Sequence, residues 1–401
     1  MYLVKGTATS IAFSTLLLLS LVSSLDRAVA QETKPEAPPG APKLNAGSWT
    51  LIDADTGLYL AGKDPDEQVP IASTTKVMVA LVALDEGVDL DEQVIVSEDA
   101  ASYAGSIYSN VGLYPYDRVS VRDLLIAALI PSGTDAVYAL AEHLGDGSVD
   151  EFVAKMNDKA KELGLENTHF ENPAGIDARG NYSSAADLAT ITREAMEHPE
   201  FRTIVDDPQA TISTQDRKIE IFTTNLLVLP NSGYDYRPAT GAKTGTSPQA
   251  GPCLVASAQS GDESYIAVVL DAAEDLQRYE AATTALEYGF GEYESEALVK
   301  RDDPYADLEL PYRRGETVKL VAARDISALA GPGLKVERRT TKEEAPPSAE
   351  TGSKLGTVTV SVEGRNVGSS PLVVQKGYEE ASLWQKVTYL AGGLKRWILS
   401  R

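Results

Sequence analysis

The chain has 401 residues and a formal net charge of -23 at pH 7, and its only cysteine is Cys253. This length exceeds one ordinary core and predicts two domains, while the acidic balance argues against nucleic-acid binding, which needs clustered Lys and Arg. A single cysteine excludes an internal disulfide and a thiolate metal cluster, and the three histidines (His143, His169 and His198) lack metal-ligand spacing, so neither a metal nor a cofactor is expected.

The N-terminus has the layout of an export signal. Lys5 supplies a basic start, residues 11–22 form a short apolar run, and Ala28-Val29-Ala30 gives a small-residue cleavage site. We therefore predict a signal peptide over residues 1–30. An uncleaved membrane anchor is the alternative, although the run is short for a span of about 20 residues. Residues 31–43 are rich in proline and charge and are expected to form an extended linker.

Between residues 44 and 297, strand-like and helix-like segments follow one another. Strand patterns occupy residues 48–53, 58–60, 242–246, 253–258 and 265–270, and helical patterns occupy residues 77–84, 121–144, 149–163 and 185–196. Helical segments thus lie between strands at both ends. This order predicts an α/β or α+β domain whose sheet is assembled from distant parts of the chain. Cys253 lies in one of the apolar strands and is expected to serve packing.

From residue 298 to residue 378 the pattern is that of a small all-β domain. Residues 317–321 and 357–362 alternate between apolar and polar side chains, and a turn follows at residues 363–366. Residues 342–353 are polar and contain proline, which predicts a surface loop.

The last segment, residues 379–401, is expected to be an amphipathic, membrane-associated helix. At 100° per residue Lys395 and Arg396 lie outside one arc of large apolar residues. Such a helix can lie in the membrane interface. A helix docked on the protein's own core, or in a dimer, is the alternative. The residues on the apolar arc are Leu383, Trp384, Val387, Leu390, Leu394, Trp397 and Ile398.

A first candidate site is the string Ser73-Thr74-Thr75-Lys76. Side chains three residues apart share a helix face, so Lys76 can accept the proton of the Ser73 hydroxyl if the lysine pKa is lowered. Burial and a second cation, Lys243, would both lower it. At a helix N-terminus the Ser73 backbone N–H could also stabilise an oxyanion. Alone, the string also fits a capped helix with a surface lysine.

The second string is Ser132-Gly133-Thr134, in a turn between two helical runs. The Ser132 hydroxyl could pass a proton between Lys76 and a leaving amine. The structural alternative is a helix cap, since serine or threonine before good helix formers is a common start signal.

The third string, Lys243-Thr244-Gly245, places a cation and a hydroxyl on a strand. We expect Gly245 to leave room for a peptide substrate that adds to the strand edge, with the Thr246 backbone N–H as a second oxyanion donor. A solvated strand end is the alternative.

In this order and spacing the three strings resemble those of the low-molecular-mass penicillin-binding proteins that are D-alanyl-D-alanine carboxypeptidases. The resemblance covers nearly the whole mature chain. It implies a penicillin-binding/β-lactamase-like transpeptidase domain of α/β (α+β) class plus a small C-terminal all-β domain. Further similar segments are residues 152–157, 163–165, 168–177, 224–227 and 250–258.

The resemblance also implies a role for each site residue. Ser73 would attack the carbonyl of the penultimate D-alanine, Lys76 would accept the proton, and Ser132 would relay it to the departing D-alanine. Water would then release the shortened peptide. The residues implied to bind substrate are Thr134, Lys243, Thr244, Gly245, Thr246 and Arg278.

The expected partners are peptidoglycan stem peptides, β-lactams that acylate Ser73, and a membrane surface. The expected location is the outer face of the cytoplasmic membrane or the cell wall. Thr134 departs from the asparagine usual in the family, which predicts weaker positioning of the peptide. Two alternatives stay open: a β-lactamase, although its glutamate-bearing loop is not evident, and a catalytically weak cell-wall or penicillin-binding module.

Overall fold

The computed structural model describes residue 38 and residues 40–399, with side chains up to residue 392. The predicted signal peptide, residues 1–30, and most of the predicted linker lie outside the described residues.

The central element is a five-stranded antiparallel sheet with strand order β2-β1-β9-β8-β7. Leu51 of β1 lies opposite Ala267 of β9, so the sheet joins distant parts of the chain, as predicted. Strand β7 lies at one edge, where the backbone groups of its outer side have no strand partner among the described residues. The strands are β1 (Ala46–Asp53), β2 (Tyr59–Lys63), β7 (Ala239–Ser247), β8 (Gly251–Ser260) and β9 (Glu263–Ala272).

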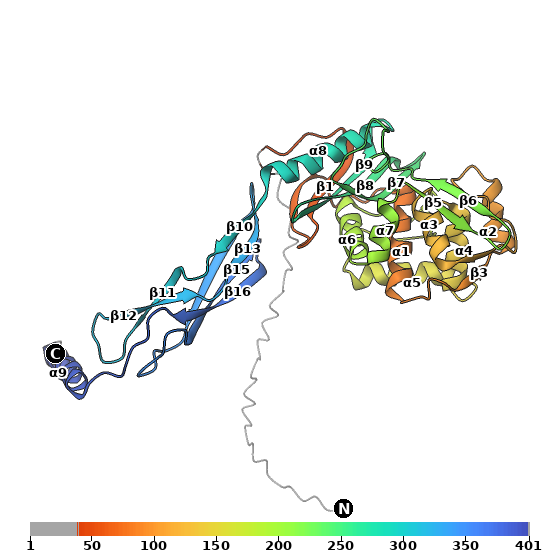
Figure 1. The fold of residues 1–401 in the computed structure, drawn as a ribbon. Helices are drawn as coiled ribbons and strands as arrows, with labels where there is room; N and C mark the ends of the chain where they lie inside the picture. Colours follow the sequence, from red (N-terminus) through yellow and green to blue (C-terminus); the bar gives the residue numbers. More distant parts are fainter. Residues whose placement is uncertain (1–37, 39, 400–401) are drawn as a thin grey trace, which may run out of the picture. The chain divides into compact units, whose positions relative to one another are not determined.

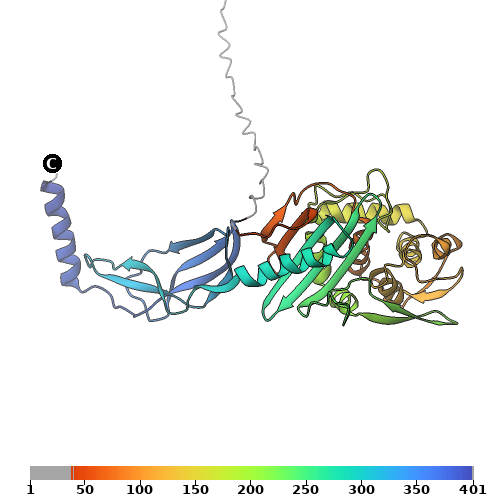
Figure 2. The same ribbon diagram turned by 90° about the horizontal axis from the view of Figure 1, so that it is seen from above.

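Both faces of this sheet are covered by helices. Helix α8 (Gln277–Glu292) packs on one face, and α6 (Ala185–Met196) and α7 (Pro199–Asp206) pack on the other (Figures 1 and 2). Because successive side chains of a strand point to opposite faces, Leu254 of β8 belongs to the core on the α8 side, whereas its neighbour Val255 belongs to the core on the other side.

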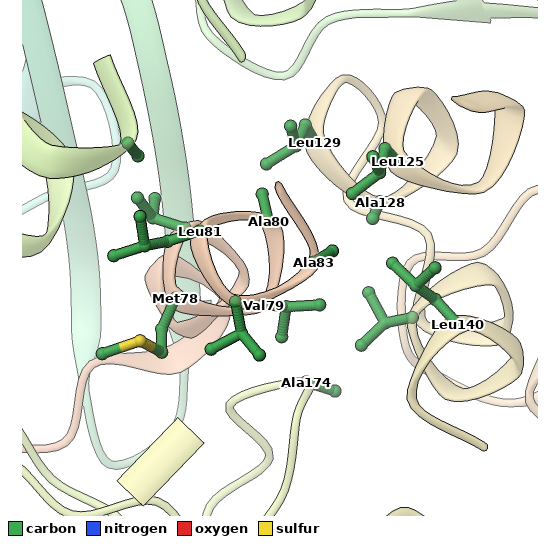
Figure 3. Packing of buried hydrophobic residues seen from close by; sticks show 14 of the residues in the cluster. Met78, Val79, Ala80, Leu81, Ala83, Leu125, Ala128, Leu129, Leu140 and Ala174 are labelled. Carbon is green, nitrogen blue, oxygen red and sulfur yellow. The ribbon is translucent and has the colours of Figure 1, made fainter. Parts of the chain in front are cut away.

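Helix α1 (Lys76–Asp85) runs through the middle of the helical core. Its residues from Lys76 to Ala83 are all buried, which is typical of a helix that is apolar all round. Figure 3 shows Val79, Ala80 and Ala83 of α1 beside side chains of the neighbouring helices. The labelled neighbours lie on α3 (Val121–Leu129) and α4 (Thr134–Leu144), and α5 (Val149–Glu162) and α6 also pack against α1. The predicted helical stretch 121–144 is therefore broken at residues 130–133.

Serine side chains cap the start of at least four described helices, the first of them Ser97, which accepts from the N–H of Ala100. Ser120, Ser148 and Ser184 each accept a hydrogen bond from the backbone N–H three residues later, which satisfies a donor that the first helical turn leaves free. The smaller elements of this part are β3 (Gln93–Ile95), α2 (Glu98–Ser102), a 3₁₀ turn (Tyr103–Gly105), β4 (Arg118–Ser120), β5 (Gln209–Ser213) and β6 (Lys218–Phe222). Strands β3 and β4, and β5 and β6, pair as two small sheets.

The C-terminal part is built from strands, which confirms the predicted all-β region. A five-stranded antiparallel sheet has the order β11-β12-β16-β15-β14, and β10 pairs with β13. The predicted polar loop begins where β14 ends, at Lys342. The strands are β10 (Glu294–Val299), β11 (Pro304–Glu309), β12 (Thr317–Ala322), β13 (Ile326–Ala330), β14 (Val336–Lys342), β15 (Lys354–Val362) and β16 (Arg365–Val374), and helix α9 (Leu383–Leu399) follows.

Candidate active site

The first string forms a contact between its two functional side chains. Ser73 lies in a 3₁₀ turn (Ala72–Thr75) directly before α1, rather than in the first α-helical turn. In a 3₁₀ helix the side chains at i and i+3 eclipse each other. The turn therefore brings the amine nitrogen Nζ of Lys76 to 2.8 Å from Oγ of Ser73.

The amine of Lys76 is fully enclosed by protein. Only 1 % of the residue is exposed, and burial lowers the pKa of Lys76 to about 7, against the opposing effect of the Asp135 carboxylate. We expected the charge of Lys243 to lower the pKa of Lys76, but the repulsion between the two lysines lowers the pKa of Lys243 instead. Its pKa is lowered well below the usual value, first by burial and then by the charges of Lys76 and Arg278. Near neutral pH, a substantial fraction of Lys76 is therefore an uncharged amine.

The second string brings another hydroxyl to the same amine. Oγ of Ser132 lies 3.2 Å from Nζ of Lys76. Ser132 has a φ of +67°, a left-handed conformation that costs a residue other than glycine about 1–2 kcal/mol. The N-cap of α4 is Gly133 and makes no side-chain cap, so the cap alternative for Ser132 is not what the structure contains. In this left-handed conformation, the Ser132 hydroxyl points at Lys76 instead of capping the helix.

The third string is buried, unlike a solvated strand end. Lys243 is 0 % exposed, and its Nζ donates to the carbonyl of Thr244 at 2.9 Å. A Cβ on Gly245 would meet the Ile71 carbonyl oxygen at 2.9 Å and the Ser73 amide nitrogen at 3.1 Å. Glycine at this position therefore allows β7 to approach the nucleophile turn. Thr246, the next residue, is exposed.

Arg278 joins the third string from the first turn of α8. It is 7 % exposed, and Nη1 donates to the Gly245 carbonyl at 3.1 Å and to Oγ1 of Thr246 at 2.8 Å. Nη2 contacts the Tyr279 hydroxyl and lies 3.2 Å from the Asp275 carboxylate. The buried Nε has no partner in the described part of the chain. Arg278 thus adds a buried guanidinium to a site that already contains the buried amines of Lys76 and Lys243.

Asp135 is a site residue that the sequence analysis missed. Its fully buried carboxylate accepts hydrogen bonds from the backbone N–H groups of Val111, Leu113 and Ala136. The neighbouring Thr134 is also buried, and its N–H donates to the Ser109 carbonyl at 2.7 Å. The loop of residues 109–113 is thereby tied to the second string. An acidic residue in the first turn of a helix is common, so the sequence carried no specific signal.

A second loop packs on the nucleophile turn. The carbonyl of Ala174 accepts from Oγ of Ser73 at 3.5 Å, and Oδ1 of Asn172 accepts from the N–H groups of Ala174 and Ile176. Gly175 has a φ of +75°, and a Cβ there would lie 1.8 Å from the Ala72 carbonyl oxygen. This loop therefore packs closely against the turn that carries Ser73.

No group of three or more His, Cys, Asp or Glu in the described range could hold a metal ion. Cys253 is buried, and burial raises the pKa of its thiol to about 12.

A family model described as D-alanyl-D-alanine carboxypeptidase matches residues 32–274. The chain belongs to this family. A second model, described as the C-terminal domain of penicillin-binding protein 5, matches residues 293–380. The family assignment and its fold class agree with the prediction, and the protein is a serine-type D-Ala-D-Ala carboxypeptidase.

Characterised relatives match over most of their length. D-alanyl-D-alanine carboxypeptidase DacF of Bacillus subtilis is 33 % identical over 362 residues, which are 88 % of this chain and 90 % of the relative. DacC of Escherichia coli is 32 % identical over 364 residues, covering 86 % and 88 %.

Two solved structures are also similar. Penicillin-binding protein 5 of Haemophilus influenzae is 30 % identical, with a TM-score of 0.64 over 84 % of this chain and 99 % of that one. The Streptomyces K15 DD-transpeptidase is 36 % identical, with a TM-score of 0.58 over 62 % of this chain and 98 % of that one.

Proposed function

We propose that this enzyme removes the terminal D-alanine from peptidoglycan stem peptides through an acyl-enzyme on Ser73. The observation that carries the proposal is the position of one buried amine between two hydroxyls. Nζ of Lys76 lies 2.8 Å from Oγ of Ser73 and 3.2 Å from Oγ of Ser132, and its pKa is about 7. A neutral amine in this place can take a proton from one hydroxyl and deliver it through the other.

In the acylation step, Oγ of Ser73 attacks the carbonyl carbon of the penultimate D-alanine while its proton passes to Lys76. The oxyanion that forms is stabilised by the backbone N–H groups of Ser73 and Thr246. Lys76 then returns the proton through the Ser132 hydroxyl to the nitrogen of the terminal D-alanine. The C–N bond breaks, free D-alanine leaves, and the peptide remains as an ester of Ser73.

The free carboxylate of the substrate is the group that Lys243, Thr244 and Arg278 would bind. Lys243, Thr244 and Arg278 lie together at the edge strand β7, and Nε of Arg278 is buried without a partner in the described chain. An extended peptide can add to this edge through backbone hydrogen bonds. The carboxylate then fixes which peptide bond reaches Ser73.

Deacylation repeats the proton transfer with water. Lys76 accepts a proton from the attacking water, and the ester oxygen of Ser73 leaves and is reprotonated. β-Lactams acylate Ser73 in the same way and act as covalent inhibitors, because their ring amide mimics the D-Ala-D-Ala bond.

Two experiments test this function together. D-Alanine release from a stem pentapeptide is measured, and mass spectrometry after brief benzylpenicillin exposure locates the adduct. We expect release by the wild type, an adduct on the peptide containing Ser73, and neither in Ser73→Ala. Rapid nitrocefin turnover without peptide hydrolysis would instead support a β-lactamase. Penicillin labelling without either activity would support a catalytically weak binding module.

We also propose export to the outer face of the cytoplasmic membrane or the cell wall, with α9 on the membrane surface. Among the described helices none is long and apolar enough to cross a bilayer. In the described turns of α9, Trp384 is 74 % exposed and Leu390 is 62 % exposed, as expected for a helix whose apolar side binds a membrane interface.

The proposed catalytic region is residues 44–297 and the proposed β-domain is residues 298–378.

A further inference from the structure

Thr224 connects three parts of the active site. It lies between β6 and β7, and its Oγ1 is 2.6 Å from Oγ1 of Thr244 in the third string. Its backbone N–H donates to the carbonyl of Ile130, two residues before Ser132, at 3.2 Å. Its own carbonyl accepts from the hydroxyl of Tyr279 at 2.8 Å, next to Arg278. Hydrogen bonds of both its N–H and its carbonyl therefore fix the Thr224 backbone, which holds the side chain in place.

The two threonine hydroxyls share one short hydrogen bond, and either oxygen could be the donor. Each hydroxyl has a single proton to donate, whereas a carboxylate only accepts. If Thr244 donated to Thr224, its lone pairs would face the substrate carboxylate and repel it. Thr244 can bind the carboxylate only if Thr224 is the donor between them.

The surroundings of Thr224 are compatible with this direction. The other acceptor near its hydroxyl is the Ile130 carbonyl oxygen, which lies 3.5 Å away, at the limit of a hydrogen bond. The Thr244 oxygen is 0.9 Å closer, from the difference between 3.5 and 2.6 Å. A proton on Thr224 is therefore better accommodated by Thr244 than by Ile130.

We propose that Thr224 is a positioning residue that directs the Thr244 hydroxyl proton toward the substrate's terminal carboxylate. This inference rests on the proposed function of the same site. Thr224 does not touch the substrate in this scheme; it acts through Thr244. It therefore sets selectivity for peptides that end in a free carboxylate, rather than the rate at which Ser73 attacks.

The test compares a diacetyl-L-Lys-D-Ala-D-Ala peptide with the same peptide ending in a carboxamide. For the full-length Thr224→Val variant we expect KM for the acid to rise about fivefold, the scale of one lost hydrogen bond, with little change in kcat. Preference for the acid over the amide should fall by a similar factor. Thr224→Ser, which keeps the hydroxyl, should restore both values.

Thr240→Val is the matched control. Thr240 lies on β7, the strand of Thr244, and its hydroxyl donates to Oγ of Ser257 at 2.9 Å, so the variant removes a similar pair outside the third string. It should keep the wild-type preference. An unchanged preference in Thr224→Val, or equal losses with both peptides that Thr224→Ser does not restore, would overturn the inference. Failure of the wild type to release D-alanine from the acid would refute the proposed function instead.

Discussion

The amine nitrogen of Lys76 lies 2.8 Å from the hydroxyl oxygen of Ser73; Ser73 lies in the 3₁₀ turn directly before α1, and Lys76 is the first residue of α1. No histidine takes part in this pair. A lysine can replace histidine as base only if its charged form is disfavoured near neutral pH. Here the helical core around α1 supplies that condition by excluding water from the amine.

Asp135 opposes the effect of burial on Lys76. Its negative charge raises the pKa of Lys76, so Asp135→Asn should move the acid limb of the acylation rate to lower pH. Since the carboxylate also holds the loop of residues 109–113, the variant should lose about 1–3 kcal/mol of unfolding free energy. Benzylpenicillin acylation rates over a pH series, together with denaturant unfolding, check both effects.

Asp117→Asn is the control for loosening of this loop. The Asp117 carboxylate accepts from the N–H of Tyr114 at 2.8 Å and pairs with Arg217. This variant should destabilise the fold without moving the acid limb. An acid limb that moves equally in both variants would contradict the electrostatic role of Asp135.

Gly245 should tolerate no side chain. Gly245→Ala places a Cβ within 3.1 Å of the Ser73 and Thr74 amide nitrogens, so β7 or the nucleophile turn must shift. We expect at least about a tenfold slower acylation and a loss of about 1–3 kcal/mol of stability. Gly291→Ala, in α8, meets nothing within 4 Å and should be neutral or slightly stabilising. Equal activity of the two variants would refute the close approach.

Replacing Thr134 by asparagine, the residue usual in the family, should improve the positioning of the peptide substrate. The amide of asparagine can donate to a substrate carbonyl while its oxygen accepts from lysine, whereas threonine has one short hydroxyl. Thr134→Asn should therefore raise kcat/KM for a stem peptide by about fivefold, the scale of one hydrogen bond. Thermal unfolding shows whether this buried position accommodates the larger side chain. Unchanged hydrolysis in a stable variant would contradict the prediction.

The amphipathic tail should attach the protein to lipid. Deleting residues 382–401 should release it from phospholipid vesicles in a flotation assay. Within the full chain, Leu390→Asp should weaken binding by about tenfold or more, because it removes an apolar anchor, whereas Thr388→Ala should not. Full vesicle binding by the truncated protein would count against the membrane role. Loss of a dimer on truncation would support the docked-helix alternative.

The sequence predicted those helices and strands that are determined by neighbouring residues, such as a capping side chain or a regular apolar pattern. Helix α6 has the predicted bounds because Ser184 caps its start and a regular apolar face follows. Helix α8 was not predicted. Its N-cap, Leu276, makes no side-chain cap, and its buried face includes the small residues Ala281, Ala282 and Ala285, which give little periodicity.

The same distinction holds for the site. The three strings were found because their residue types and order are specific in combination. Asp135 was missed, and Thr224 was noted only within the similar segment 224–227 and given no role. Their partners are backbone groups and a hydroxyl brought together from distant segments. Gly245 was noticed, but the strand that approaches Ser73 is visible only in three dimensions.

Lys76 activates Ser73 as an uncharged amine, and the pH dependence of acylation tests this role most directly. Because the pKa of Lys76 is lowered to about 7, the neutral form grows as pH rises through 7. The rate constant for acylation by benzylpenicillin should therefore rise about tenfold per pH unit below 7 and level off above it. A rate that stays flat from pH 5.5 to pH 9, or that still rises toward pH 10, would contradict the account.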